Sequence, residues 1–199
     1  MIRLIPVTMD NSMVIEEILA KVSGEKIRDI WYRPAGEVPT DPARRWHGPI
    51  HNVDIDVKIF TTNHALTISW ARDHLIEGLA LEIQDLPLQN SFEEEWCAVS
   101  KIAEWAPFLS KSITGFSPVW HKINPADSAA LWSMRMEVSA GSSLVLALGE
   151  LDLSGKPTYH PDGILVFFST DLARRYRINS SIFSAWGEVP ELPPGALNS

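Results

Sequence analysis

The sequence predicts an α+β fold, a single domain over residues 1–199 in which a mainly antiparallel β-sheet packs against one long and two shorter helices. Three observations predict it. Several segments alternate apolar and polar residues, as half-buried strands do, and two further runs, 143–151 and 164–168, are largely apolar, as central strands covered on both faces are. Other segments space their apolar residues at helical intervals. The 199 residues are 45% hydrophobic, which is enough for one sizeable core.

The first expected element is a helix within residues 10–25. Asn11 or Ser12 is its N-cap, and Gly24 ends it. Between them the apolar residues recur at helical spacing: Val14, Ile15, Ile18, Leu19 and Val22. This pattern predicts an amphipathic helix with its acidic residues facing water.

An antiparallel meander is expected next. Residues 26–33 are typical of a strand, and 53–60 alternate most clearly, with Val53, Ile55, Val57 and Ile59 on one face and Asp54, Asp56 and Lys58 on the other. Residues 61–65 make a turn, and 66–70 and 78–83 continue the alternation.

The long helix is expected over residues 91–106. Ser91 and Glu94 form a capping box, and Pro107 ends the helix. Its apolar stripe contains Phe92, Trp96, Val99 and Ala103, with Ile102 and Ala106 at the edge, and is predicted to pack on the sheet. Trp105 falls off this stripe, and we expect it to be buried beneath the following loop.

The second half of the chain predicts three more strands and a short helix. Residues 130–138 alternate, and the two apolar runs follow. A helix capped by Ser169 or Thr170 is expected over 169–178, and the tail 188–199, with three prolines, is expected to be loosely held.

The charge distribution limits the partners. The formal net charge is −8, and residues 73–104 hold eight acids and one lysine. Such a field repels phosphate backbones and attracts basic surfaces, so nucleic acid is not expected as a ligand, whereas a basic protein is. The alternative is a solvated acidic face that only aids solubility.

Cysteine content and hydropathy favour a soluble cytoplasmic protein. The single cysteine, Cys97, allows no internal disulfide, and the chain does not start with basic residues followed by an apolar run. No segment approaches eighteen unbroken apolar residues, so no membrane association is expected. Cys97 lies on the polar side of the expected long helix beside acidic residues, which disfavours a reactive thiolate.

Residues 47–56 give the sharpest enzymatic hypothesis. His47, His51, Asp54 and Asp56 could together hold a divalent metal and activate water for hydrolysis. Against this, the intervening Gly-Pro excludes a helical turn, and the spacing matches no known ligand pattern, so the sequence predicts no metal and no other cofactor.

Two loops are candidates for partner contacts. Residues 34–52 are a nineteen-residue connection with four prolines, and they form either a binding loop or a strap anchored by Trp46. Residues 155–176 begin with the Gly and Pro residues of a long turn between two strands. We expect this turn to expose Lys156, Tyr159, His160 and Asp162 at its tip.

A resemblance adds to this interpretation. The strand pattern of 53–83, followed by "LVLALGELDLSGKPTYHPDGILVFFSTDLARRY", resembles small uncharacterised bacterial cytoplasmic proteins, including immunity proteins of polymorphic-toxin and contact-dependent inhibition systems. The resemblance implies a non-catalytic protein that blocks a toxin. The residues expected to contact a basic toxin are Glu93, Glu94, Glu104, Trp46, Tyr159, His160 and Asp162. A structural subunit whose acidic face is only solvated stays an alternative.

Overall fold

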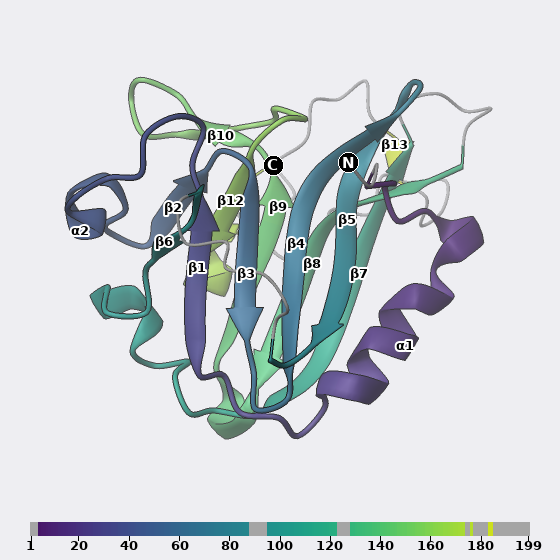
Figure 1. Cartoon of the computed structure of the whole chain (residues 1–199). Helices are drawn as coiled ribbons and strands as arrows, with labels where there is room; N and C mark the ends of the chain where they lie inside the picture. Colours follow the sequence, from purple (N-terminus) through teal and green to yellow (C-terminus); the bar gives the residue numbers. More distant parts are fainter. Residues whose placement is uncertain (1–3, 88–94, 123–127, 174–175, 177–182, 185–199) are drawn as a thin grey trace.

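Two antiparallel β-sheets lie face to face in this protein (Figure 1). The structure, a computed structural model, describes residues 4–87, 95–122, 128–173, 176 and 183–184. The first sheet has the strand order β5-β4-β3-β1-β6 and consists of β1 (Asp29–Arg33), β3 (Asp56–Phe60), β4 (His64–Asp73), β5 (Ile76–Asp85) and β6 (Cys97–Ala98).

The second sheet has the order β13-β7-β8-β9-β12-β2. Its strands are β2 (Ile50–Val53), β7 (Ile113–Lys122), β8 (Ala130–Val138), β9 (Ser143–Leu148), β12 (Ile164–Phe167) and β13 (Phe183–Ser184). A separate short pair, β10 (Glu150–Leu151) and β11 (Pro157–Thr158), lies within the connection from β9 to β12. Buried side chains from the inner faces of both sheets form one apolar cluster.

The fold is therefore mostly antiparallel β with few short helices. Within the described part of the chain, α1 (Met13–Val22) is the one helix of seven or more residues, whereas α2 (Pro42–Arg45) and α3 (Thr170–Ala173) have four residues each. The prediction of one long and two shorter helices was wrong.

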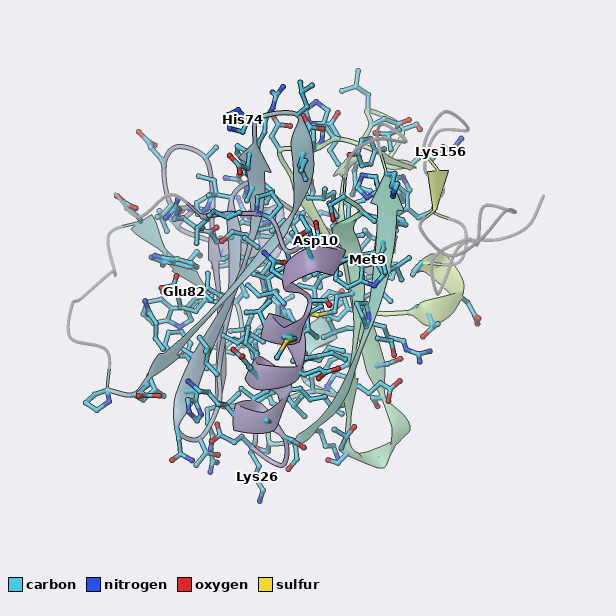
Figure 2. All side chains as sticks on the ribbon, turned by 90° about the vertical axis from the view of Figure 1, so that its right-hand side faces the viewer. Met9, Asp10, Lys26, His74, Glu82 and Lys156 are labelled. Atoms are coloured by element: carbon cyan, nitrogen blue, oxygen red, sulfur yellow. The ribbon has the colours of Figure 1, made fainter. Side chains whose placement is uncertain are left out.

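Helix α1 forms where the sequence predicts it. Ser12 is its N-cap, and Gly24, just beyond its end, has φ +82°, a conformation that favours glycine. Ile15, Ile18 and Val22 are buried. Figure 2 shows α1 in front of the two sheets, and it contacts β5 and β7, so it closes the open side of the sandwich.

The predicted meander is confirmed in strands β3, β4 and β5, which pair in sequence order. Val57 pairs with Ile68, which pairs with Leu81, and Ile59 pairs with Leu66, which pairs with Ile83. These residues face the second sheet. The strands predicted at β8 and β12 are also confirmed, and every residue of β12 is buried. The strand predicted over 143–151 forms only over Ser143–Leu148, because Glu150 and Leu151 belong to the separate β10–β11 pair.

The single strand predicted over 53–60 is instead two strands in different sheets. β2 pairs with β12, whereas β3 pairs with β1 and β4. The chain bends at Asp54, whose carbonyl accepts a hydrogen bond from Trp70 Nε1 (2.9 Å) and whose carboxylate accepts from the Ala35 amide (2.8 Å). The alternation of apolar residues continues through the bend, which explains why the pattern did not reveal it.

The predicted helix 91–106 does not form over its described part, 95–106. Cys97 and Ala98 pair with β1 instead, and Ala103–Trp105 form only a 3-10 turn. Successive backbone hydrogen bonds join Ile102 to Val99, Trp105 to Ile102 and Phe108 to Trp105. The buried residues therefore recur every third position, and this spacing resembles that of an α-helix. Trp105 is fully buried, as predicted.

The segment before α1 joins the two sheets. The Val7 amide donates to the Leu79 carbonyl of β5, and the Val7 carbonyl accepts from the Leu131 amide of β8. Thr8 also forms an isolated antiparallel bridge with Ala130. One short stretch of backbone is thus hydrogen-bonded to both sheets.

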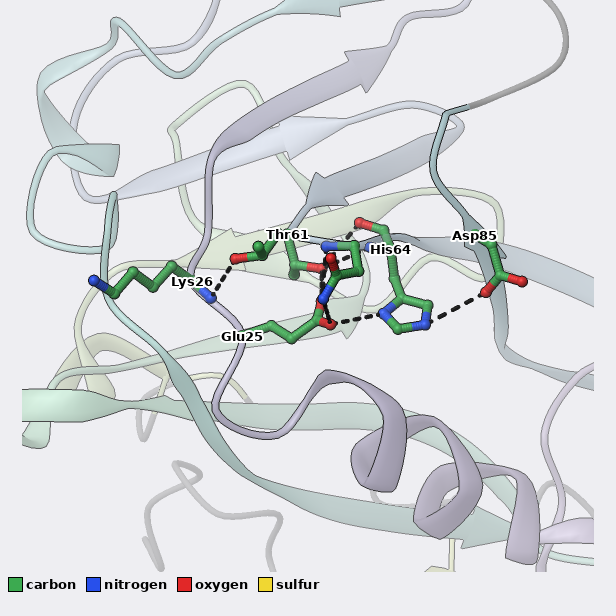
Figure 3. A network of polar contacts seen from close by, with 7 residues as sticks. Glu25, Lys26, Thr61, His64 and Asp85 are labelled. Carbon is green, nitrogen blue, oxygen red and sulfur yellow. Dashed lines mark hydrogen bonds and ion pairs between the residues drawn. The ribbon is translucent and has the colours of Figure 1, made fainter.

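A network around Glu25 ties the segment after α1 to the β3–β4 turn (Figure 3). The Glu25 carboxylate accepts hydrogen bonds from Thr61 Oγ1 (2.5 Å) and Asn63 Nδ2 (2.8 Å) and contacts His64 Nδ1 (3.0 Å). Although burial opposes ionisation, the hydrogen bonds from Thr61, Asn63 and His64 lower the pKa of Glu25 to about 2.

We expect the substitution Glu25→Gln to destabilise the protein by about 1–2 kcal/mol at neutral pH, because a charged acceptor of several hydrogen bonds is lost. Since the pKa is lowered on folding, this contribution is present above pH 4.5 and disappears as the pH falls towards 2. Urea unfolding of both proteins across this range measures the difference. Glu17→Gln, on the exposed face of α1, is the control and should cost little. A constant difference down to pH 2 would contradict the assignment.

Candidate functional site

A pocket of about 540 Å³ opens at a junction of four chain segments. These segments are the loop before β2, the turns after β6, the β8–β9 connection and the end of β12. Its lining residues are Gly48, Pro49, Glu104, Pro107, Phe108, Gly141, Ser142, Ser143, Phe168 and Thr170. The pocket thus combines one carboxylate, two aromatic rings and three hydroxyl groups, and its volume is typical of ligand-binding sites.

Glu104 is the charged group of this pocket. The turns at 99–109 bury Val99, Ile102 and Trp105, which leaves the Glu104 side chain partly exposed. Its Oε1 accepts a hydrogen bond from the Gly48 amide (2.7 Å). Among the described residues, no lysine or arginine lies within ion-pair distance of this carboxylate, whose nearest ionisable partner is His51, with Nε2 4.0 Å from Oε2.

Behind Glu104, three buried side chains form a hydrogen-bonded chain. Trp105 Nε1 donates to the Tyr32 hydroxyl oxygen (3.0 Å), and that hydroxyl lies 3.0 Å from His51 Nδ1. Because the Tyr32 oxygen already accepts from Trp105, its own hydrogen is available for Nδ1. This assigns the remaining proton of the imidazole to Nε2, which faces Glu104 and has no hydrogen-bond partner within the described structure.

His51 is neutral at physiological pH. Only 1% of the residue is exposed, and burial lowers the pKa of its imidazole to about 4; His47 lowers it further, and the Glu104 carboxylate opposes the shift. Burial also raises the pKa of Tyr32 far above its ordinary value. The hydrogen-bonded chain of Trp105, Tyr32 and His51 therefore brings no positive charge to Glu104.

Phe168 lies at the centre of an aromatic cluster beside the pocket. Its ring packs edge-on against His51 (centroids 4.7 Å apart) and Trp105 (4.9 Å), and it lies 5.9 Å from Phe108. On the opposite wall, Ser143 Oγ lies 3.2 Å from Thr170 Oγ1. A group bound here would meet a negative carboxylate, aromatic faces and hydroxyl oxygens, a set that suits a cationic hydrogen-bond donor.

The four residues of the metal hypothesis do not come together. His47 is exposed, His51 faces the interior between the sheets, Asp54 is paired with Arg45, and Asp56 lies on the outer face of the first sheet, 3.1 Å from Arg33 Nε. The bend between β2 and β3 separates them. Within the residues that the structure describes, no three His, Cys, Asp or Glu side chains are grouped so as to hold a metal ion.

The outer face of the first sheet carries a second polar layer. Asp56 and Lys58 are buried there, and Trp96 covers them, with the Lys58 Nζ 4.3 Å from its ring. Burial raises the pKa of Asp56 and lowers that of Lys58, although each group opposes the shift of the other. Arg33 and Glu82 also act on both groups, so Asp56 and Lys58 belong to a set of interacting charges of both signs.

The predicted contact residues are spread over the molecule. Trp46 is 1% exposed and donates through Nε1 to the Asn52 carbonyl (2.8 Å), so it anchors a strap and presents no ring surface. Tyr159 packs on His121 at a centroid distance of 5.9 Å. His160 and Asp162 form an ion pair in the β11–β12 connection, as the turn interpretation of 155–176 allows. Glu93 and Glu94 lie outside the described residues.

The described acidic residues of 73–104 do not share one face. Asp73 and Asp85 lie at opposite ends of the β4–β5 hairpin, and Glu104 lies in the pocket beyond β6. Cys97, predicted on a polar helix face, is buried in β6, where burial raises the pKa of its thiol.

The sequence indicated Glu104 for its charge and His51 for metal binding, but it did not indicate that the two side chains lie beside each other. The signal that could have placed Glu104 is the three-residue spacing of Val99, Ile102, Trp105 and Phe108. No local pattern indicates that Tyr32 and Phe168 join the same cluster.

Within the described part of the chain, no helix has the length and apolar character needed to cross a bilayer. Comparison of the chain with protein-family models, with curated proteins and with solved structures found no match.

Proposed function

We propose that the protein is a non-catalytic binding module that blocks a basic protein in the cytoplasm, in the manner of a bacterial immunity protein that neutralises a toxin. The observation that carries this proposal is the Glu104 carboxylate in an open aromatic pocket, with no lysine or arginine of the described chain beside it. A partly desolvated carboxylate without a counter-ion favours a cationic partner group.

The overall charge supports the same partner class. A net charge of −8 increases the rate at which a basic protein approaches, and this effect weakens as salt screens the field. Since the acids of 73–104 lie on several faces, general attraction would come from the whole surface, whereas specific recognition would come from the pocket. The two contributions can be separated by mutation.

The test uses two neutral substitutions and two salt concentrations. Wild-type protein, Glu104→Gln and Glu95→Gln are immobilised, and partners from a lysate of the source cells are identified by mass spectrometry at about 50 mM and about 500 mM salt. Glu95 is the matched control because it belongs to the same acidic segment but its side chain is 75% exposed and far less constrained. We expect a basic protein that is held by wild type and Glu95→Gln at low salt, released at high salt, and held poorly by Glu104→Gln.

The blocking activity is then measured directly. If the captured protein arrests growth when expressed, co-expression of wild type should restore growth, and Glu104→Gln should restore it less. The proposal fails if no basic protein is retained, if the retained protein is equally active with and without this chain, or if Glu104→Gln retains it as well as wild type does.

A further inference from the structure

We propose that the pocket around Glu104 is a receptor for one arginine side chain, with the guanidinium group paired to Glu104 and stacked on Phe168. The inference rests on the proposed function for the source of the arginine, a basic partner protein. The chemistry of the pocket itself stands independently of that source.

The Glu104 carboxylate supplies the negative charge of the pocket. Glu104 Oε1 accepts from the Gly48 amide, which fixes the carboxylate at the pocket wall. Gly48 has φ +80°, so this amide is held in a backbone conformation that favours glycine. Oε2 receives no hydrogen bond from a described residue and faces His51 at 4.0 Å. Acceptor capacity on both oxygens therefore remains for a ligand.

His51 is a buried polar group that faces the same carboxylate. Its Nε2 has no partner within the described structure, although the imidazole is almost fully buried. Because Tyr32 and Trp105 fix the ring from the other side, His51 presents an N–H dipole to Glu104 without adding a positive charge. This arrangement positions the carboxylate and leaves its charge for the ligand.

The combination of a carboxylate with aromatic rings favours arginine over lysine. Guanidinium is planar, carries several donors in a fork that matches a carboxylate, stacks on aromatic faces and is weakly hydrated. The rings of Phe108 and Phe168 lie 5.9 Å apart beside Glu104, and the hydroxyls of Ser142, Ser143 and Thr170 supply further acceptors. A compact ammonium group is more strongly hydrated and lacks the planar fork, so it should gain less than guanidinium does from the carboxylate and the rings together.

The pocket is larger than a single side chain. A volume of about 540 Å³ exceeds what one side chain fills, so there is room for the peptide that carries it. This fits an arginine presented on a loop of a protein partner.

The test uses N-acetyl-L-arginine methylamide as the probe, with the citrulline and lysine analogues as comparisons. Citrulline has nearly the shape of arginine but carries no charge, so it isolates the contribution of the charge. We expect the arginine probe to bind with a dissociation constant on the order of 1 mM and the citrulline analogue at least about tenfold more weakly, with lysine between them. Calorimetry or NMR titration measures the constants.

The position of binding is read from the indole N–H signal of Trp105, assigned among the eight tryptophans by Trp105→Phe. The arginine probe should shift this signal, since Trp105 contacts both Tyr32 and Phe168. Glu104→Gln should weaken binding about tenfold with an unchanged unfolding midpoint, and Glu95→Gln should leave binding unchanged. Phe168→Leu should reduce the preference for arginine over lysine.

Equal binding of the citrulline analogue, no shift of the Trp105 signal, or full binding by Glu104→Gln would overturn the inference. Its failure is distinguishable from failure of the proposed function. If the probe binds at Glu104 but no basic protein is retained by the chain, the arginine receptor stands and the partner-blocking role falls. If a basic partner is retained while the probe does not bind, the partner-blocking role stands and the arginine receptor falls.

Discussion

Lowering the pH from 7 to 4 is expected to destabilise the protein by about 3–6 kcal/mol through two buried histidines alone. Burial lowers the pKa of His51 and of His121 to about 4, from an unfolded value of 6.5. The Ala130 carbonyl opposes the shift of His121, but Nδ1 of that ring has no hydrogen-bond partner of ordinary geometry among the described residues, and burial prevails.

The direction follows from proton uptake. Between pH 6.5 and 4 the unfolded chain protonates both imidazoles, whereas the folded protein leaves them neutral. Stability is therefore highest above pH 6.5, falls through this window, and loses nothing more from these groups below pH 4. The groups that face them do not reverse this direction: Glu104 opposes the shift of His51 only in part, and Tyr159, beside His121, stays neutral because burial raises its pKa.

Urea unfolding followed by tryptophan fluorescence at pH 7, 5.5 and 4 measures the effect. His121→Phe removes one titrating ring and should reduce the slope by about half, whereas His74→Gln, whose side chain is 89% exposed, should not change it. Equal stability of the wild type at pH 6.5 and pH 4 would show that the buried imidazoles accept protons in the folded state.

Replacing Gly149 with alanine is expected to cost about 3 kcal/mol or more, because the site has no space for a methyl group. The added Cβ would collide with the Tyr176 hydroxyl and would lie 2.8 Å from the Thr158 carbonyl oxygen and 2.9 Å from Leu165 Cδ1. The Tyr176 hydroxyl is fixed because it donates to the Leu148 carbonyl, and the glycine itself is fixed because its amide donates to Gly163 O (3.0 Å).

Gly155 provides the matched control. It has φ +77°, but a Cβ there would meet no atom within 4 Å, so Gly155→Ala should cost only about 1 kcal/mol for backbone strain. Chemical unfolding of the two variants compares a glycine with close neighbours and φ +154° with a glycine in open space at φ +77°. Equal losses at the two positions would mean that the β9–β12 connection yields to the methyl group.

Periodicity predicted those elements whose environment is uniform along their length. Strands β3, β4 and β5 have one face towards the core, and β9 and β12 are covered on both faces, so the apolar pattern reports the structure directly. Helix α1 combines an apolar stripe at helical spacing with a stop at Gly24, so it too is encoded locally.

Prediction failed where distant partners decide the local conformation. Cys97 and Ala98 could have continued a helix, but Tyr32 and Trp31 of β1 offer them an unpaired strand edge. Similarly, the bend at Asp54 depends on hydrogen bonds from Ala35 and Trp70, which lie far away in the sequence. A window of neighbouring residues contains neither influence.

The candidate site shows the same division. Acidic composition was sufficient to select Glu104, but its pocket is formed by Phe108, Phe168 and the β8–β9 connection, which meet only after both sheets have formed. His51 was recognised as chemically unusual and assigned to the wrong chemistry, because its partners Tyr32 and Glu104 are 19 and 53 positions away.

The backbone hydrogen bonds of Val7 affect how the two sheets separate during unfolding. Because its amide is hydrogen-bonded to Leu79 and its carbonyl to Leu131, separating either sheet from this segment breaks a backbone hydrogen bond of Val7. Exchange of the Val7 amide with solvent should then report separation of this segment from β5, and exchange of the Leu131 amide should report its separation from β8.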